Sequence, residues 1–458
     1  MAKERQVTEQ PADAAASPDP TSMLTSKAFV VLLMLAAVVG VVVSLAAWGF
    51  LELVHQIQVG VFDDLPGQLG FEDGAPLWWS VPVLGLAGLV VAFAIVRLPG
   101  RGGHVPAEGL KTEVTQPVEL PGVMLAAVAT IGLGIVLGPE APLIALGGGL
   151  GILAVRLIPR DLPPQVSAVI AASGTFAALT LIFESPLVSA VILIEATGVG
   201  GPRLPLVLVP GLLAAGIGSL VSIGMGSWTG LSSSDYALGT LDLPAFARPD
   251  VADFGWTIAL AVACAVGVFV VLRLAREAEG FLMRRPFLLL PAAGIAVAGL
   301  AIAFSQAADK GVDQVLFDGQ DALGPLTSDA STWSLSALAL LIAFKGLAWS
   351  ISLGGFRGGP VFPSLFLGAA AGVMAAQLPG FSITPAVAVG MGAAVVSVLK
   401  LPLSAVVLAV LLTANAGAGA GPLIIVGVVV AYLTTQLLWG LGSSEEVRPP
   451  PPEAPARR

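Results

Sequence analysis

The chain has 458 residues, of which 56% are hydrophobic and only 11% charged, and its mean hydropathy is +0.92. Soluble globular domains carry about 25% charged residues, so water is not the main solvent of this chain. The net charge of −9 comes largely from loop aspartates, and no basic patch is interleaved with aromatic residues, which excludes nucleic acid as a partner. The single cysteine, Cys264, excludes an intrachain disulfide and a thiolate metal cluster and is expected to fill core space.

Apolar runs long enough to cross the roughly 30 Å hydrocarbon core of a bilayer recur along the chain. Glycine and proline, 55 and 35 residues in all, occur inside these runs as well as between them. Such breaks persist in a membrane only where the freed backbone groups face protein or a watery cavity. The predicted fold class is therefore all-α, a polytopic membrane protein of many tilted and broken helices. The clearest predicted spans are 28–50, 77–96, 121–137, 204–226, 254–272, 287–305, 334–353 and 421–441.

Both ends of the chain, residues 1–26 and 442–458, are predicted to be disordered tails because they are polar and rich in Pro and Ala. Neither a signal peptide nor a soluble regulatory domain is expected.

Loops 97–111 and 273–285 are basic, whereas loops 56–76, 235–253 and 309–329 are mostly acidic. The positive-inside rule puts the basic loops on the cytoplasmic side. The prediction is a multi-pass protein of the cell membrane with both termini cytoplasmic.

The sequence contains an internal repeat. Residues 138–151, GPEAPLIALGGGLG, share both prolines, the Leu-Gly pair and the final glycine with residues 359–372, GPVFPSLFLGAAAG. SPLVSAV at 185–191 and LPLSAVV at 401–407 form a second, looser match in the same order. An odd number of apparent spans separates the copies, which indicates two halves of opposite topology, 27–226 and 254–441, joined by an extracytoplasmic loop at 227–253. Inverted repeats with interrupted helices place a transport site near the membrane midplane.

The repeated Gly-Pro segments are suited to holding an anion. A dehydrated anion is very costly in hydrocarbon unless fixed dipoles replace its water. Helix N-termini supply such dipoles through free N–H groups, without a Lys or Arg that would hold the ion too tightly. The candidates are 138–142 and 359–363, with a weaker one at 102–106, since each combines glycine for close approach with proline near a first helical turn.

These segments resemble signatures of the chloride-channel (CLC) family. GPEAP at 138–142 is similar to that family's GREGP motif, GPVFP at 359–363 to its GIFAP motif, and GGHVP at 102–106 to a degenerate GSGIP motif. The resemblance covers residues 27–441 and implies the CLC-type inverted repeat. It also implies a homodimer with a separate anion path in each subunit, and chloride or a similar anion, protons and the lipid bilayer as partners. No cofactor and no metal are implied.

Glu140 takes the position of the family's gating glutamate. An ionised carboxylate there would occupy the anion site itself, and protonation would release it and admit the ion. The alternative is a carboxylate that caps its own helix N-terminus. The resemblance favours gating, and it implies that the anion is bound by a set of residues around this glutamate: Gly138, Glu140, Ala141, Gly359, Val361, Phe362 and Gly103.

The chain departs from the antiporters of the family at the inner proton relay. In the register of the helix that follows residue 185, Glu195 matches the first residue of the family's Glu-Glu pair, and Ala196 takes the relay position. The expected relay is therefore missing. Glu195 is a candidate replacement on the proton path, although a helix-end carboxylate at a subunit or water interface is the simpler interpretation.

The inner hydroxyl gate is also absent or replaced. The family's coordinating serine falls on Gly103, and its coordinating tyrosine has no counterpart, since only Tyr236 and Tyr432 exist. His104 lies beside this gap and could donate an N–H to an anion, but a lone loop histidine more often faces solvent.

Two prolines and two basic residues modify the signatures further. Pro139 and Pro360 each remove a backbone donor, which leaves the amides of residues 140, 141, 361 and 362 and predicts weaker, less selective anion binding than in well-matched family members. Arg357, in a Gly-rich loop, is the candidate for steering anions toward the path. Lys345 is expected to snorkel or to pair with a carboxylate. The glycines at 147–151 are expected to allow close helix packing.

The predicted function is transport of small inorganic anions, chloride foremost, sensitive to protons through Glu140 and weakly or not coupled to them. The alternatives are a chloride/proton antiporter and a transporter of fluoride or another anion. An intramembrane enzyme is not expected, because the two histidines, His55 and His104, and the loop aspartates form no catalytic constellation. The binding site of an organic-solute transporter is expected to contain charged or aromatic side chains, and the Gly/Pro signatures contain few of them.

Overall fold

The structure is a computed structural model, and it describes residues 24, 26–72, 74–109, 114–158, 162–201, 204–231 and 237–443. The predicted tails lie almost wholly outside the described residues. Five residues of the acidic and basic loops considered above also lie outside them: Asp73, Leu110, Lys111, Asp235 and Tyr236.

The described chain is helical throughout, apart from turns and short extended links. The first half contains α2 (Lys27–Val59), α3 (Leu65–Gln68), α4 (Ser80–Arg97), α5 (Leu120–Gly132), α6 (Glu140–Arg156), α7 (Pro164–Phe183), α8 (Pro186–Thr197) and α9 (Leu204–Thr229). The second half contains α10 (Val251–Leu282), α11 (Pro286–Ala308), α12 (Gln320–Ser328), α13 (Leu335–Gly355), α14 (Val361–Ala375), α15 (Ile383–Leu399), α16 (Pro402–Leu412) and α17 (Gly421–Ser443). The protein is thus a polytopic all-α membrane protein, as predicted.

Eight helical segments of the described chain are long and apolar enough to cross a membrane, and seven coincide with predicted spans. The predicted span 121–137 is wrong. Helix α5 ends at Gly132 and the chain turns at Gly134, which has φ of +88°, because the peptide must leave the helix to reach the Gly138-Pro139 turn. The eighth span is α7, Pro164–Phe183. Its Ser, Thr and Gly residues obscure the apolar run in the sequence, yet they are buried against neighbouring helices.

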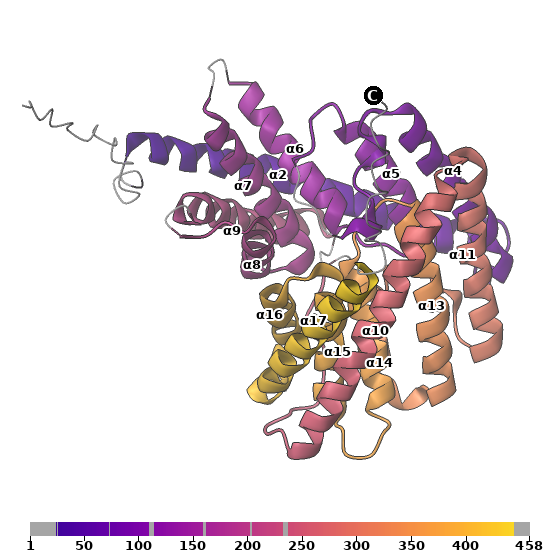
Figure 1. Cartoon of the computed structure of the whole chain (residues 1–458). Coiled ribbons are helices and arrows are strands. Elements are labelled where there is room, and N and C mark those ends of the chain that lie inside the picture. The colour runs from indigo at the N-terminus through magenta and orange to yellow at the C-terminus, as the bar shows by residue number, and fades with distance from the viewer. Residues whose placement is uncertain are drawn as a thin grey trace, which may run out of the picture.

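The same packing recurs in the two halves (Figure 1). Helices α6 and α7 contact each other as α14 and α15 do, and α2 packs on α7 and α9 as α10 packs on α15 and α17. The halves meet through contacts of α4 with α11 and of α8 with α16. In Figure 1 most indigo and magenta helices lie in the upper part of the view, and the orange and yellow helices α13–α17 lie below them. This recurrence supports a division into halves at 27–226 and 254–441.

Glycines set the close approach of the central helices in both halves. A Cβ at Gly147 of α6 would lie 2.5 Å from the Gly174 carbonyl oxygen of α7, which is too close for any side chain. A Cβ at Gly368 of α14 would collide with the Gly390 carbonyl oxygen of α15 in the same way. Close packing at 147–151 is therefore confirmed, and it brings the first turns of α6 and α14 to the centre of the protein.

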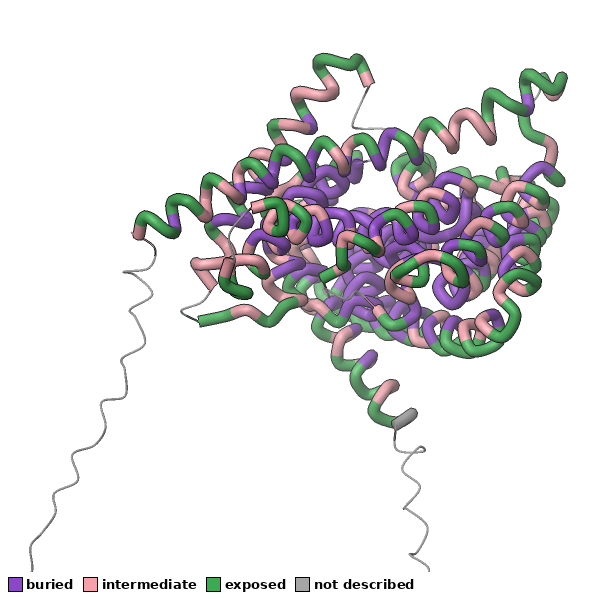
Figure 2. The backbone as a smooth tube through the Cα atoms, turned by 90° about the horizontal axis from the view of Figure 1, so that it is seen from above, coloured by how far each residue is buried: buried purple, intermediate pink, exposed green. Residues whose placement is uncertain are grey.

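Burial follows this arrangement (Figure 2). The buried parts of the chain gather in the middle of the bundle and exposed residues on its outer helices. Every residue of α15 from Thr384 to Leu399 is buried, as expected for a helix that is apolar all round. The link at 237–250 packs as well, because Leu238 donates its N–H to the Ile182 carbonyl and Leu241 to the Leu412 carbonyl.

Candidate anion pathway

The two Gly-Pro signatures meet at the centre of the protein. Gly138 and Gly359 form an isolated antiparallel bridge, in which the N–H of Gly138 donates to the Gly359 carbonyl at 2.8 Å and the N–H of Gly359 donates to the Gly138 carbonyl at 2.6 Å. Each glycine immediately precedes the proline that caps its helix. The bridge therefore brings the N-terminus of α6 beside the N-terminus of α14.

Each of these termini offers two backbone donors. Helix α6 begins at Glu140 and α14 at Val361, and the third helical residue of each is a proline, Pro142 or Pro363, which has no N–H. The free amides are those of the first two residues of each helix, since the first turn has no intrahelical acceptors. The two bridge glycines use their amides on each other, so they provide space rather than donors for an anion.

The Glu140 carboxylate lies on the terminus of the opposite helix. Its Oε1 accepts a hydrogen bond from the Phe362 N–H at 2.9 Å, whereas Oε2 is buried and accepts none from the described residues. The side chain is only 1% exposed. The backbone amides of Glu140, Val361 and Phe362 all act on this carboxyl, so it lies at the start of its own helix and at the start of α14, where two helix dipoles favour a negative group.

Glycine at positions 138 and 359 leaves room for this carboxylate. A Cβ built at Gly359 or at Gly138 would overlap Glu140 Oε2. The Gly residues of the signatures therefore keep open the volume that the carboxylate fills.

A cavity of about 240 Å³ leads to the first turn of α6 from one side. We call it the Arg357 cavity. Its wall includes residues of the 100–104 loop, the first turn of α6 and the loop before α14: Gly102, Gly103, His104, Ala141, Pro142 and Arg357. A wider cavity of about 800 Å³, lined by Arg101, Glu279 and Met283, shares Gly103 and Arg357 with it. The predicted candidates Gly103 and Arg357 thus lie beside the same space as Ala141.

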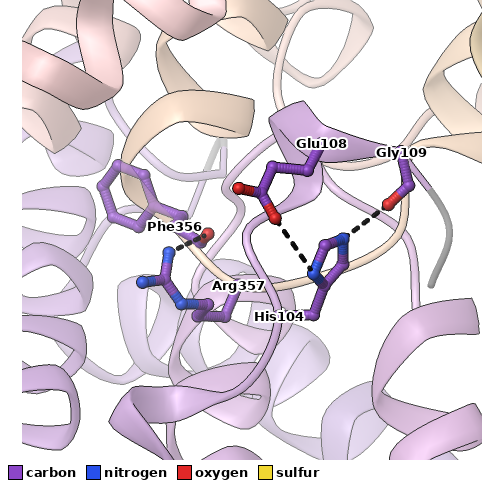
Figure 3. Close-up of polar contacts among 5 residues, drawn as sticks. All are labelled: His104, Glu108, Gly109, Phe356 and Arg357. Carbon is purple, nitrogen blue, oxygen red and sulfur yellow. Dashed lines mark hydrogen bonds and ion pairs between the residues drawn. The ribbon is translucent and has the colours of Figure 1, made fainter. Parts of the chain in front are cut away.

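Arg357 is buried in the wall of this cavity (Figure 3). The residue is 5% exposed, and its Nη1 donates to the Phe356 carbonyl at 3.0 Å. Its Nε is buried and has no hydrogen-bond partner in the described part of the chain. Arg357 therefore places a positive charge beside the cavity, with its Nε donor buried and unmet.

His104 also lines the cavity, and its side chain is 21% exposed. Its Nε2 lies 2.6 Å from the Gly109 carbonyl oxygen, and its Nδ1 lies 3.8 Å from a Glu108 oxygen (Figure 3). Both ring nitrogens thus face groups of the 104–109 loop. The ring shapes the loop at the mouth of the cavity.

A second, small cavity of about 40 Å³ reaches Pro139, the residue before Glu140. We call it the His55 cavity. Its wall includes His55, Gln58, Pro139, Asp318 and Asp321, and Asp318 is the charged residue that acts electrostatically on Glu140. The two chain neighbours of Glu140, Pro139 and Ala141, thus line different cavities, one with acidic groups and one with an arginine.

Lys345 does not snorkel, and its nearest polar partners in the described residues are backbone carbonyls, while Asp318 and Asp313 act on it electrostatically. It is fully buried, and its Nζ donates to the four consecutive carbonyl oxygens of residues 314–317 at 3.0 to 3.3 Å. The ammonium also lies 4.5 Å from the centre of the Phe366 ring of α14. Through these bonds the lysine of α13 holds the loop that carries Asp318.

Glu195 is engaged at the start of another helix. Its Oε1 accepts from the Leu403 N–H at 2.9 Å, and its Oε2 accepts from the Ser404 N–H at 2.7 Å and hydroxyl at 2.6 Å. The carboxylate of α8 thus caps α16, its counterpart in the second half. The neighbouring Ala196 has no proton to give. Tyr432 lies partly buried within α17.

Sequence reasoning missed two features of the site. The acidic residue Asp318 was assigned only to an acidic loop, and His55 only to the inventory of histidines. The sequence signal for Asp318 is the turn-forming pair Asp318-Gly319. In the structure the flanking residues Phe317 and Gly319 both have positive φ, 56° and 92°. The Phe317 N–H donates to the Gly134 carbonyl at 3.0 Å, which ties this loop to the segment before α6.

Comparison with known proteins agrees with this geometry. The family model described as voltage gated chloride channel matches residues 21–198 and 87–436. The chain is 30% identical over 346 residues to "Putative ion-transport protein YfeO" of Escherichia coli O9:H4 (strain HS), a match that spans 74% of this chain and 77% of that protein.

Solved structures show the same fold. A slow cyanobacterial Cl⁻/H⁺ antiporter aligns with a TM-score of 0.71 at 19% identity, over 91% of this chain and 99% of its own. A eukaryotic CLC transporter aligns with a TM-score of 0.67 at 16% identity, over 89% of this chain and 71% of its own. A CLC-type fluoride/proton antiporter aligns with a TM-score of 0.59 at 19% identity, over 89% of this chain and 96% of its own. The chain belongs to the voltage-gated chloride channel (CLC) family.

Proposed function

We propose that this protein carries chloride or a similar small inorganic anion across the cell membrane, and that protonation of Glu140 opens the path. The observation that carries the proposal is the hydrogen bond from the Phe362 N–H to the Glu140 carboxylate at 2.9 Å. A negative group already occupies the paired helix termini. An external anion needs the same donors, so it competes with the carboxylate for them.

The expected pH response follows from charge. Ionised Glu140 holds its charge-assisted bond and excludes the anion, whereas the neutral acid loses most of that attraction and leaves the site. Anion flux should therefore rise as pH falls. The Arg357 cavity lies on the side of the basic loops, which the positive-inside rule makes cytoplasmic, and this orientation also puts both termini in the cytoplasm.

Coupling to protons is proposed to be weak or absent. A stoichiometric antiporter needs a second protonatable group on the inner side, and that position is Ala196. The neighbouring Glu195 is held by three hydrogen bonds at the start of α16. Chloride/proton antiport remains the second candidate, supported by the cyanobacterial structure of the same fold, and fluoride transport the third, supported by the fluoride/proton antiporter.

Purified protein in liposomes tests the proposal. Chloride efflux should increase with falling pH in the wild type, while Glu140→Ala should be fast and insensitive to pH. Glu277→Gln, at an exposed position of α10, is the matched control and should behave as the wild type. If Glu140→Ala leaves both rate and pH response unchanged, the gating role is wrong. A chloride gradient that drives protons uphill would show antiport instead.

Assembly as a homodimer belongs to the same proposal and comes from family membership. Cross-linking in native membranes or mass measurement in detergent should give two chains per particle.

A further inference from the structure

The loop that carries Asp318 is fixed beside the start of α6. The N–H of Phe317 donates to the carbonyl of Gly134 at 3.0 Å, in the segment that leads into α6. On its other side the loop is held by Lys345, whose Nζ binds the backbone carbonyls of residues 314–317. These contacts come from two different parts of the fold. The Asp318 side chain therefore has a defined place near the Glu140 turn.

Asp318 presents its charge to the His55 cavity without an ion-pair partner. Its Oδ1 accepts from the Gln320 N–H at 3.1 Å, and no Lys, Arg or His of the described residues lies within ion-pair distance of it. Asp318 and Pro139 both line this cavity, and Asp318 acts electrostatically on Glu140. A like charge nearby disfavours the ionised form of a carboxyl. The charge of Asp318 therefore favours uptake of a proton by Glu140.

Few other titratable groups surround Asp318. Asp321 in the first turn of α12 and Lys345 of α13 act on it electrostatically, and His55 of α2 shares its cavity wall. The neighbouring helices α5 and α14 carry no titratable side chain. Burial raises the pKa of Asp318 to about 6. At neutral pH Asp318 is therefore largely ionised, and its charge acts on Glu140 in the range where the gate is proposed to respond.

A larger cavity lies next to the His55 cavity. Its volume is about 480 Å³, and it shares His55, Gln320 and Asp321 with the smaller one. The rest of its wall includes residues 237–241 of the link between the two halves. The proposed orientation puts this link on the extracytoplasmic side. The two cavities therefore mark the side from which a proton can approach Asp318.

We propose that Asp318 is a second carboxylate of the gate, and that its negative charge raises the pH at which Glu140 releases the anion path. This inference rests on the proposed gating by Glu140 and adds a positioning residue to it. Asp318 acts on Glu140 through charge and does not itself bind the anion. Two interacting carboxylates take up their first proton at a higher pH than either would alone. A neutral residue at position 318 removes this effect.

Asp318→Asn tests the proposal, because asparagine keeps an oxygen for the Gln320 N–H and removes the charge. Chloride efflux from liposomes is measured across pH. The pH of half-maximal flux should fall by about 0.5–1 unit, while the maximal flux at low pH should stay the same, since both carboxyls are then neutral. A merely structural role would change the maximal flux and leave the midpoint in place. Asp318→Glu keeps the charge and should keep the wild-type midpoint.

Two further variants complete the comparison. Asp329→Asn, at an exposed position at the end of α12, removes an acidic charge of the same loop and should leave the midpoint unchanged. The double variant Glu140→Ala with Asp318→Asn should be as insensitive to pH as Glu140→Ala alone, because Asp318 acts only through Glu140. If Asp318→Asn does not fold, Asp318→Ser supplies the same loss of charge with a hydroxyl acceptor.

The two proposals fail in different ways. If Glu140→Ala is insensitive to pH but the neutral variants at position 318 keep the wild-type midpoint or raise it, the role of Asp318 is wrong and the gating proposal stands. If Glu140→Ala keeps the wild-type pH response, the gating proposal itself is wrong. Elution as a single species in size-exclusion chromatography confirms that each variant is folded.

Discussion

Glu140 and Phe362 are 222 residues apart in the sequence, yet the backbone N–H of Phe362 donates to the Glu140 carboxylate at 2.9 Å. The side chain at the start of α6 thus occupies the terminus of α14. This contact links the two halves of the chain at the point where an anion would pass. It depends on the bridge between Gly138 and Gly359, which sets the two helix starts side by side.

A methyl group at Gly359 is expected to displace the Glu140 carboxylate. The Cβ of Gly359→Ala would overlap Oε2, so the side chain must leave the site in the way that protonation is proposed to release it. Chloride efflux at neutral pH should rise several-fold and lose most of its pH response. Flux in liposomes across pH measures this.

Two variants control for the Gly359 change. Gly299→Ala adds a methyl group in α11 where nothing lies within 4 Å and should behave as the wild type. Combining Gly359→Ala with Glu140→Gly removes the overlap and should restore the yield of folded protein if it is reduced. A folded Gly359→Ala with wild-type pH response would contradict the proposed gate.

Glu195→Gln tests whether this carboxylate is a cap or a proton carrier. A cap loses its charge-assisted bonds to the first turn of α16, which should cost about 1–2 kcal/mol and lower the melting temperature in detergent. Anion flux and its pH dependence should stay unchanged. Loss of proton movement without loss of stability would instead place Glu195 on a proton path, and Glu277→Gln provides the exposed control.

Lys345→Met should destabilise the loop that carries Asp318. Four carbonyl oxygens at residues 314–317 lose their common donor, and methionine fills similar space without replacing those bonds. The expected loss is on the order of 3 kcal/mol, since removal of the charge recovers part of the desolvation cost. Thermal unfolding in detergent measures it, with Lys27→Met at the exposed start of α2 as control. An unchanged melting temperature would show that the carbonyl contacts contribute nothing.

Overpacking between α14 and α15 should prevent folding. Gly368→Val would force a side chain onto the Gly390 carbonyl of α15, where every neighbour is buried and cannot move. We expect little folded protein in detergent by size-exclusion chromatography. Gly216→Val in α9, where a Cβ meets nothing within 4 Å, should fold normally. Normal yield of Gly368→Val would contradict the close approach of these helices.

The membrane class, seven of the eight spans and the meeting of residues 138 and 359 were predictable from sequence. Hydropathy is a local property, and a repeated motif marks equivalent places in two halves without any knowledge of their contacts. The predicted span 121–137 was wrong because hydropathy averages over a window of residues. That average does not reveal that α5 ends at Gly132 and that the chain turns at Gly134.

The sequence by itself determined that this is a membrane protein made of two related halves. It also determined that a Gly-Pro pair precedes a central helix in each half. Only the tertiary structure decided which donors are used. The Phe362 amide donates to Glu140, four carbonyls accept from Lys345, and the start of α16 binds Glu195. Each of these contacts joins segments far apart in the chain, and their pairing depends on how helices cross, which no local pattern of residues encodes.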